Sequence, residues 1–275
     1  MEDLLTIYPK KLFPCLLKAF LVVISLSLIA ISLDHYFKNI AHNQAIATSY
    51  TFKTYVVGMF DSNGEKNIPT YFSFLNLIIS AVLLGTIGKV VKDSNEPRYY
   101  KRWYLLGCLF IFLALDELLM LHEIMGLPFI ALLKFINNGN EISFVRFTGF
   151  IPYFLVGFFS FAYFLNWFLA LPRRTMISFV VSGLVVVFGA LGVEMIGEYL
   201  IGIYGKYSFP YKAATTFEES FEMLGIIYFI KALIDYLETK KETISLGFDF
   251  RNGQKSHFAS EEATPEVNRR EKHLI

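Results

Sequence analysis

The amino-acid sequence predicts an all-α fold: a polytopic membrane helix bundle with six transmembrane helices and both termini in the cytoplasm. Three observations support this prediction, namely an apolar composition, six long apolar segments, and basic residues that gather in alternate links. The chain has 275 residues, of which 55% are hydrophobic and 17% aromatic, and its mean hydropathy is +0.48. Soluble domains are about 45–50% apolar on a comparable count, so the composition favours lipid surroundings.

The six apolar segments are close to the length of helix that crosses a bilayer, roughly 18–20 residues for about 30 Å of hydrocarbon. They lie near residues 12–33, 71–91, 103–123, 150–171, 176–200 and 218–237. The first segment is too long for a signal peptide and has no small-residue cleavage site, so we expect it to be retained. The segments form one membrane domain, residues 1–238, and the polar stretch 239–275 is predicted to be a flexible cytoplasmic tail.

Lysine and arginine are frequent beside both termini and in the links that join the second span to the third and the fourth to the fifth. These residues are Lys10, Lys11, Lys18, Lys89, Lys92, Arg98, Lys101, Arg102, Arg173, Arg174, Lys240 and Lys241. The other links carry fewer basic residues for their length. Because short cytoplasmic loops collect Lys and Arg, this alternation predicts that both termini face the cytoplasm.

The first outer link, residues 34–70, contains two local patterns. Its stretch TSYTFKTYVVGMF is rich in Thr, Tyr, Val and Phe, which favours a short pair of strands. The sequence Asp61-Ser-Asn63-Gly64 that follows predicts a tight turn. Pro69 suits the first turn of the next helix, because a helix leaves its first backbone N–H groups without partners.

Several function classes lack their usual residues in this chain. A formal net charge of +1 gives no basic excess for binding nucleic acid. Cys15 and Cys108 both fall in predicted spans and form no Cys-x-x-Cys motif. The sequence contains no phosphate-binding loop, no nucleophile elbow and no haem-binding pair of histidines. The polar residues inside the spans are therefore the best source of functional information.

A Glu-x-x-Gly pattern occurs within or at the end of three predicted spans, at Glu123–Gly126, Glu194–Gly197 and Glu222–Gly225. The third and fifth spans run outward and end near their copies, whereas the sixth runs inward and begins near its own. The three copies are therefore predicted to converge at the outer end of the bundle. Ionisable groups inside a membrane are costly and are usually functional or paired, so this convergence indicates a site.

The predicted site contains carboxylates and one imidazole. Glu194 and Glu198 are four residues apart, as are Glu218 and Glu222, so each pair shares a helix face and repels. Such acids need a cation, shared protons or water, and Arg146 is the cation that the sequence places nearby. The predicted ligands of a metal are Asp116, Glu117, His122, Glu123, Glu194, Glu198, Glu219 and Glu222.

A divalent metal fits this set of ligands. Carboxylates with one histidine suit Mg²⁺, Ca²⁺, Mn²⁺ or iron better than structural zinc, which favours Cys and His. The chain has no Glu-x-x-His motif, which disfavours a di-iron centre of the helical-bundle type. We expect the side chains of Asp116, Glu123, Glu194 and Glu222 to line one cavity between the third, fifth and sixth spans.

The segments FLALDELLMLHE, GALGVEM and EESFEMLG together resemble an uncharacterised group of bacterial multi-pass membrane proteins. The similarity covers roughly residues 67–237. It implies the same six-helix fold in a bacterial inner (plasma) membrane, and it implies no activity.

Three functions fit these residues. The first is a metal-dependent membrane enzyme with an outward-facing site, acting on a lipid or periplasmic substrate. The second is a cation or proton transporter that uses the same carboxylates, although a transporter needs access from both sides. The cytoplasmic halves of the spans offer no matching set of acids, and Lys231 and Asp235, four residues apart near the inner surface, are expected to pair. The third is a membrane scaffold or assembly factor with a structural polar cluster.

Overall fold

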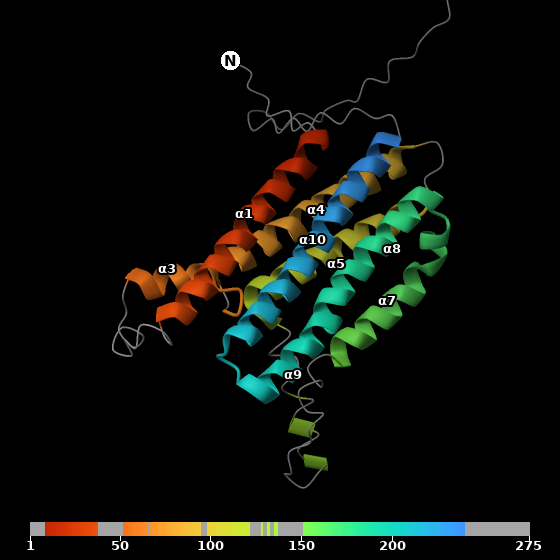
Figure 1. Ribbon diagram of the computed structural model, residues 1–275. Helices are drawn as coiled ribbons and strands as arrows, with labels where there is room; N and C mark the ends of the chain where they lie inside the picture. Colours follow the sequence, from red (N-terminus) through yellow and green to blue (C-terminus); the bar gives the residue numbers. More distant parts are fainter. Residues whose placement is uncertain are drawn as a thin grey trace, which may run out of the picture. The chain divides into compact units, whose positions relative to one another are not determined.

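The computed structural model describes residues 9–37, 52–64, 66–94, 98–121 and 151–239, together with five isolated positions between 128 and 136. Every regular element in these residues is a helix (Figure 1). In chain order they are α1 (Pro9–His35), α3 (Phe52–Phe60), α4 (Ile68–Asp93), α5 (Tyr100–Leu119), α7 (Ile151–Leu169), α8 (Arg173–Val187), the π-helix η3 (Phe188–Val193), α9 (Glu194–Tyr204) and α10 (Phe209–Thr239). The all-α prediction is confirmed for the described residues, and a helix occupies each of the six predicted spans.

Three of these helices are long and apolar enough to cross a membrane: Lys11–His35, Ile68–Asp93 and the continuous run Arg173–Tyr204. The apolar helix Leu155–Leu169 is shorter. Large apolar side chains cover the outward faces of these helices. Phe159, Leu184 and Met195 are each at least 63% exposed. Apolar surface of this extent is typical of contact with lipid, so the helices have the properties of a membrane protein.

Helix α10 contacts more of the other helices than any other described element, since it packs against α1, α4, α8, η3 and α9. Its residues Met223, Ile227 and Ile230 are at most 1% exposed and form a core with Leu16 and Phe20 of α1. Helix α5 packs mainly against α4. It reaches α10 through Phe110, whose ring stacks on that of Phe229 at 5.0 Å between centroids.

The described part of the segment predicted to form a pair of strands, residues 52–60, is helical instead. Residues Phe52–Phe60 form α3, and the N–H of Asp61 donates to the carbonyl of Val57 at 3.0 Å, as in a helix. The strand prediction was based on β-branched and aromatic content, which depends strongly on context. Phe52, Val56 and Phe60 are four residues apart, and this is the spacing of one helix face. The spacing is compatible with a helix, and β-branched and aromatic content alone did not predict the local structure.

The turn predicted after this segment is present. The N–H of Gly64 donates to the carbonyl of Asp61 at 3.0 Å, and the N–H of Asn63 donates to the side chain of Asp61 at 3.1 Å. Asn67 then caps α4 by accepting from the N–H of Thr70 at 2.9 Å, and Pro69 lies in the first turn as expected.

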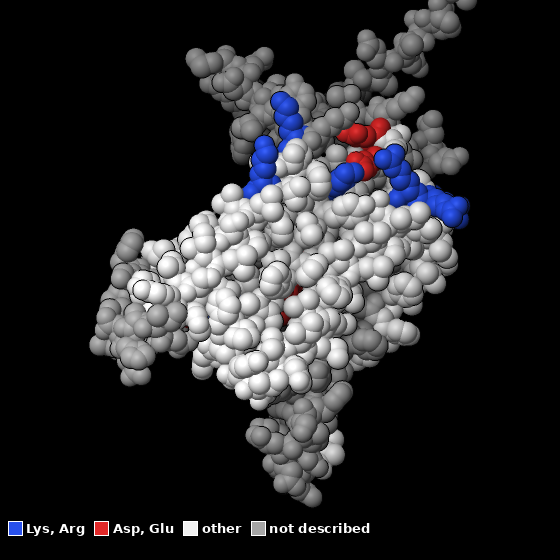
Figure 2. All heavy atoms as spheres, in the orientation of Figure 1, with Lys and Arg blue, Asp and Glu red and all other residues white. Residues whose placement is uncertain are grey.

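The charged side chains of the described helices are unevenly distributed along the bundle. Lys and Arg gather over one end in Figure 2, and the face between the ends is almost free of charge. At this end, which we call the basic end, α4 leads to α5, α7 leads to α8 and α10 finishes (Figure 1). At the opposite end α1 finishes, α9 leads to α10 and the glutamates of these two helices lie nearby.

Candidate functional site

The glutamates of α10 lie on the half of the helix that faces the bundle. Phe217, which is 54% exposed, marks the outward face. Glu219 lies between Thr216 and Met223, each 1% exposed, so it continues a buried stripe. Glu218 and Glu222 border the contact with η3 on the next face around the helix. All three glutamates are half-buried, so none points fully into lipid.

The glutamates of α9 follow directly after a π-helical turn. The π-helix η3 covers the sequence Phe188–Val193, and Glu194 is the first residue of α9. A π-helical turn widens the backbone, and such turns are frequent at functional sites in membrane and soluble helices. Two glycines, Gly189 and Gly192, fall in this segment, so its weak preference for α-helix is visible in the sequence.

Glu194, Glu198 and Glu218 lie within direct electrostatic range of one another, and we call these three residues the acidic cluster. They bring together α9 and α10, which run in opposite directions. Each carboxylate is half-buried. Among the described residues, Glu194 and Glu218 form no salt bridge with Lys, Arg or His, whereas Glu198 has an interaction partner of its own. The predicted cation Arg146 lies outside the described residues. Like charges in a poorly screening medium repel, so the cluster needs protons or a bound cation.

The glycines of the Glu-x-x-Gly pattern serve helix packing in the two described copies. A Cβ atom added to Gly225 would lie 2.5 Å from a methyl group of Val186 and 3.0 Å from the carbonyl oxygen of Ser182. A Cβ on Gly197 would contact the ring of Tyr211 at 3.6 Å. These glycines let α10 approach α8 and α9 closely, and this approach brings the glutamates of α9 and α10 together. Gly126 of the third copy lies outside the described residues.

Helix α5 ends earlier than the sequence predicted. Its last residue is Leu119, and Met120 adopts a left-handed conformation with φ 57°. The N–H of Met120 donates to the carbonyl of Asp116 at 2.7 Å, which closes the helix. A straight helix from 103 to 123 was therefore wrong at its last turn. The helical spacing used to relate Asp116 to Glu123 therefore does not apply beyond Leu119, and Glu123 itself lies outside the described residues.

The two described acids of α5 lie on different faces. Trp103, Gly107 and Ala114 form the buried stripe of this helix, and Glu117 follows Ala114 by three residues, so it continues the stripe inward. Asp116 lies about 100° around the helix, at the border of the outward face. Both side chains are half-buried and each has an interaction partner. Glu117 is therefore better placed than Asp116 to face the bundle.

The predicted metal set is only partly described. His122 and Glu123 lie outside the described residues, and Glu219 and Glu222 have interaction partners of their own. In the part of the chain that the structure describes, no three His, Cys, Asp or Glu side chains meet as metal ligands. Glu194, Glu198 and Glu218 lie within electrostatic range of one another but do not form such a group, and a metal site that includes His122 and Glu123 stays a prediction.

A buried group of salt bridges that the sequence analysis missed lies at the first turn of α10. The ammonium of Lys212 donates to Asp34, at the end of α1, at 2.9 Å, and to Asp61, after α3, at 2.5 Å. The Lys212 side chain is 8% exposed, and those of Asp34 and Asp61 are 17% and 15% exposed. The cluster ties three elements that are far apart in the sequence.

Two opposing effects set the pKa of Lys212. Burial lowers it, because the charged form loses hydration, but the hydrogen bonds and the attraction to Asp61 and Asp34 outweigh burial and hold the pKa above its ordinary value. Lys212 is therefore charged at neutral pH. The sequence places Asp34, Asp61 and Lys212 at the same predicted end of the bundle. This shared position is the feature of the sequence from which their pairing could have been predicted. The predicted pair Lys231–Asp235 is confirmed at 2.7 Å.

Comparisons with known proteins identify a family. No curated protein matches the chain, and no solved structure matches it. The sequence model of a family described as "Domain of unknown function (DUF8692)" matches residues 16–237, a range that runs from α1 to the last turn of α10 and includes the acidic cluster. Because the match spans well over half of the 275 residues, the chain belongs to this family.

Proposed function

We propose that the chain is an inner-membrane protein that binds a divalent cation at its acidic cluster and uses it in metal-dependent chemistry on a lipid or periplasmic substrate. The observation that carries this proposal is that three half-buried carboxylates, those of Glu194, Glu198 and Glu218, lie within electrostatic range of one another. A divalent ion offsets several carboxylates at once and prefers oxygen ligands. His122, Glu123 and Glu222 are the further ligands that the sequence supplies at this end.

The same proposal assigns the orientation. Six helices cross the membrane, the basic end faces the cytoplasm and the acidic cluster opens toward the outer leaflet. A bound metal there polarises a substrate carbonyl or phosphoryl oxygen or activates a water molecule. A carboxylate of the cluster that does not bind the metal is then placed to accept or return a proton.

Thermal unfolding of the purified full-length protein in detergent tests the proposal. A ligand that binds only the folded state stabilises it by about 2.7 kcal/mol at a concentration 100 times Kd. Wild type should therefore melt at a lower temperature with a chelator and recover when one of Mg²⁺, Ca²⁺ or Mn²⁺ is restored. Glu194→Gln and Glu218→Gln should each remove this response.

The same experiment also distinguishes loss of metal binding from destabilisation of the fold by the substitution. Because each Glu→Gln change removes a repelling charge, both variants should melt at a higher temperature than wild type when chelator is present. Asp235→Asn is the matched control, since Asp235 pairs with Lys231 at the basic end, and it should keep the full metal response. A wild type that ignores both chelator and metals contradicts the proposal.

That last outcome favours a second function, proton or cation transport by the same carboxylates. It has one specific observation in its favour: in the described residues no three ligands meet as a metal site. Acids that share protons instead of a metal reduce their mutual repulsion in the same way. The melting temperature would then depend on pH near neutrality and not on chelator, and Glu218→Gln would remove that dependence.

A further inference from the structure

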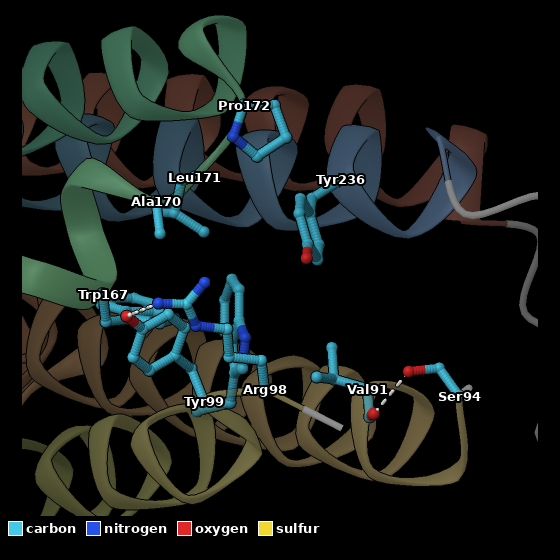
Figure 3. A pocket seen from close by; sticks show the side chains of 10 residues that line it. Val91, Ser94, Arg98, Tyr99, Trp167, Ala170, Leu171, Pro172 and Tyr236 are labelled. Carbon is cyan, nitrogen blue, oxygen red and sulfur yellow. Dashed lines mark hydrogen bonds between the residues drawn. The ribbon is translucent and has the colours of Figure 1, made fainter. Parts of the chain in front are cut away.

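A cavity of about 280 Å³ lies at the basic end, at the opposite end of the bundle from the acidic cluster. Four parts of the chain enclose it: the end of α4, the start of α5, the link from α7 to α8 and the last turns of α10 (Figure 3). We call it the basic-end pocket. Ligand pockets commonly measure about 300–1,000 Å³, so this one suits a small group such as a lipid headgroup and not a whole lipid.

Three side chains that line the pocket can only donate hydrogen bonds, and three hydroxyls can donate as well as accept; they are Arg98, Trp103 and Trp167, and Ser94, Tyr99 and Tyr236. Arg98 lies at its edge, and the indole N–H of Trp167 is buried with no acceptor among the described residues, although the residue is only 3% exposed. None of the described residues that line the pocket is Asp or Glu. An indole N–H and a guanidinium can only donate hydrogen bonds. A buried donor without an acceptor is costly, so this lining favours an anionic ligand.

The arginines of this region have no carboxylate partner in the described part of the chain. Arg98 donates to the hydroxyl of Tyr99 at 3.0 Å, which leaves the hydroxyl hydrogen of Tyr99 free to bind a ligand (Figure 3). The guanidinium of Arg102 lies over the rings of Tyr99 and Tyr163, at 5.1 Å and 4.9 Å, and its Nη1 is buried without a partner. Two guanidinium groups therefore flank one tyrosine beside the cavity.

Tyr99 reaches this position through an uncommon backbone conformation. Its φ is 65°, in the left-handed region that L-residues other than Gly, Asn and Asp rarely adopt. It immediately precedes α5, so the conformation turns the ring toward Arg98 and Arg102. Strained residues of this kind are concentrated at binding and active sites, where surrounding contacts hold them.

We propose that the basic-end pocket binds a phosphate group, supplied either by an anionic lipid headgroup or by free phosphate. The guanidinium of Arg98 and the indole N–H of Trp167 donate to phosphate oxygens, with the hydroxyl of Tyr99 as a third donor. The aromatic walls of Trp103 and Trp167, whose ring centroids are 4.8 Å apart, exclude water from one side. In the orientation proposed above, on which this source depends, α5 and α8 begin at the cytoplasmic surface of the bilayer, where a lipid headgroup can reach the pocket.

The chain provides its own reporter for this test. It contains two tryptophans, Trp103 and Trp167, and both line the pocket, so intrinsic tryptophan fluorescence reports on this cavity alone. The full-length protein in neutral detergent is titrated with dioctanoyl phosphatidylglycerol, with inorganic phosphate and with dioctanoyl phosphatidylcholine. The proposal predicts a saturable change with one of the first two ligands. The tighter ligand identifies the source of the phosphate.

Three variants sharpen the result. Arg98→Gln should weaken binding by about 10- to 100-fold, since it removes a charged hydrogen bond, and Arg98 is exposed, so the variant remains folded. Trp167→Phe keeps the aromatic wall but removes the N–H, which should weaken binding by about fivefold while Trp103 still reports. Lys101→Gln is the matched control, because Lys101 is exposed one residue into α5 and does not line the pocket. It should change the affinity less than Arg98→Gln does.

Two outcomes contradict the proposal. One is the absence of a saturable response to both phosphatidylglycerol and phosphate. The other is a response that is equal for phosphatidylcholine, or equal in Arg98→Gln and Lys101→Gln, which indicates insertion of detergent or lipid at a surface and not binding to these donors.

Discussion

Gly189→Ala tests how closely α10 and the π-helix approach, and this approach holds the acidic cluster together. A Cβ at Gly189 would lie 2.9 Å from the carbonyl oxygen of Glu218, 2.9 Å from Cβ of Phe221 and 3.2 Å from Cγ of Glu222. Non-bonded carbon atoms prefer about 3.5–4.0 Å. Two of the three atoms belong to or lie beside the backbone, so a change of rotamer cannot relieve the contact. The helices must separate by several tenths of an ångström.

The expected cost is that of an overpacked core, about 1–3 kcal/mol. An alanine in place of glycine also favours the helix by up to about 1 kcal/mol, so the comparison needs a control with the same chemical change. Gly183→Ala in α8 provides it, since a Cβ there meets nothing within 4 Å. Gly189→Ala should therefore be less stable than Gly183→Ala by about 1–3 kcal/mol.

Thermal unfolding of both variants in one detergent, followed by circular dichroism, measures this difference. For a chain of 150–250 residues, 1 kcal/mol corresponds to roughly 2–4 °C in Tm. Because the contact borders Glu218 and Glu222, Gly189→Ala should also reduce the stabilisation by added metal. If the two variants melt at the same temperature, the helices are not as close as the structure has them, and the packing explanation of the glycines is wrong.

Three further predictions concern the charged groups and the orientation. Lys212→Met leaves Asp61 without its cation in a site that is mostly buried, so it should cost about 3–5 kcal/mol in unfolding free energy, and Asp61→Asn in the same chain should recover part of the loss. Because the pKa of Lys212 lies above its ordinary 10.5, its contribution is fully present below that value and is lost only as pH rises through the higher pKa of the folded state. The Lys212→Met difference in Tm should therefore be equal at pH 7 and pH 9. Asn95→Cys should react with a membrane-impermeant thiol reagent only after the membrane is opened, and Asn140→Cys should react in intact cells; the reverse pattern contradicts the orientation.

The sequence was most informative where one physical effect dominated. The cost of exposing backbone polar groups to lipid makes long apolar segments helical, so the positions of the six helices followed from hydropathy alone. The pair Lys231–Asp235 followed from helical spacing. The convergence of Glu194 with the glutamates of α10 followed from counting the directions of the spans.

Features that depend on tertiary contacts were not predictable in this way. The left-handed Met120 that ends α5 is a residue with no turn preference, so hydropathy extended the helix past it. The salt bridges of Lys212 join residues 151 and 178 positions away, and no local pattern encodes them. In the sequence, the glycines after Glu194 and Glu222 could leave room either for a ligand or for a neighbouring helix. The atoms around Gly197 and Gly225 belong to neighbouring helices, so the structure supports the second interpretation.

The central claim, that the acidic cluster binds a divalent cation, is tested most directly by elemental analysis of the full-length protein purified without chelator. Wild type should carry about one divalent ion per chain, of one element. Glu218→Gln, prepared in parallel, should carry less than about a tenth of that amount, since it removes one of the carboxylates of the cluster. Asp235→Asn should carry as much as wild type. A wild type without stoichiometric metal, or a Glu218→Gln variant that retains it in full, would contradict the claim.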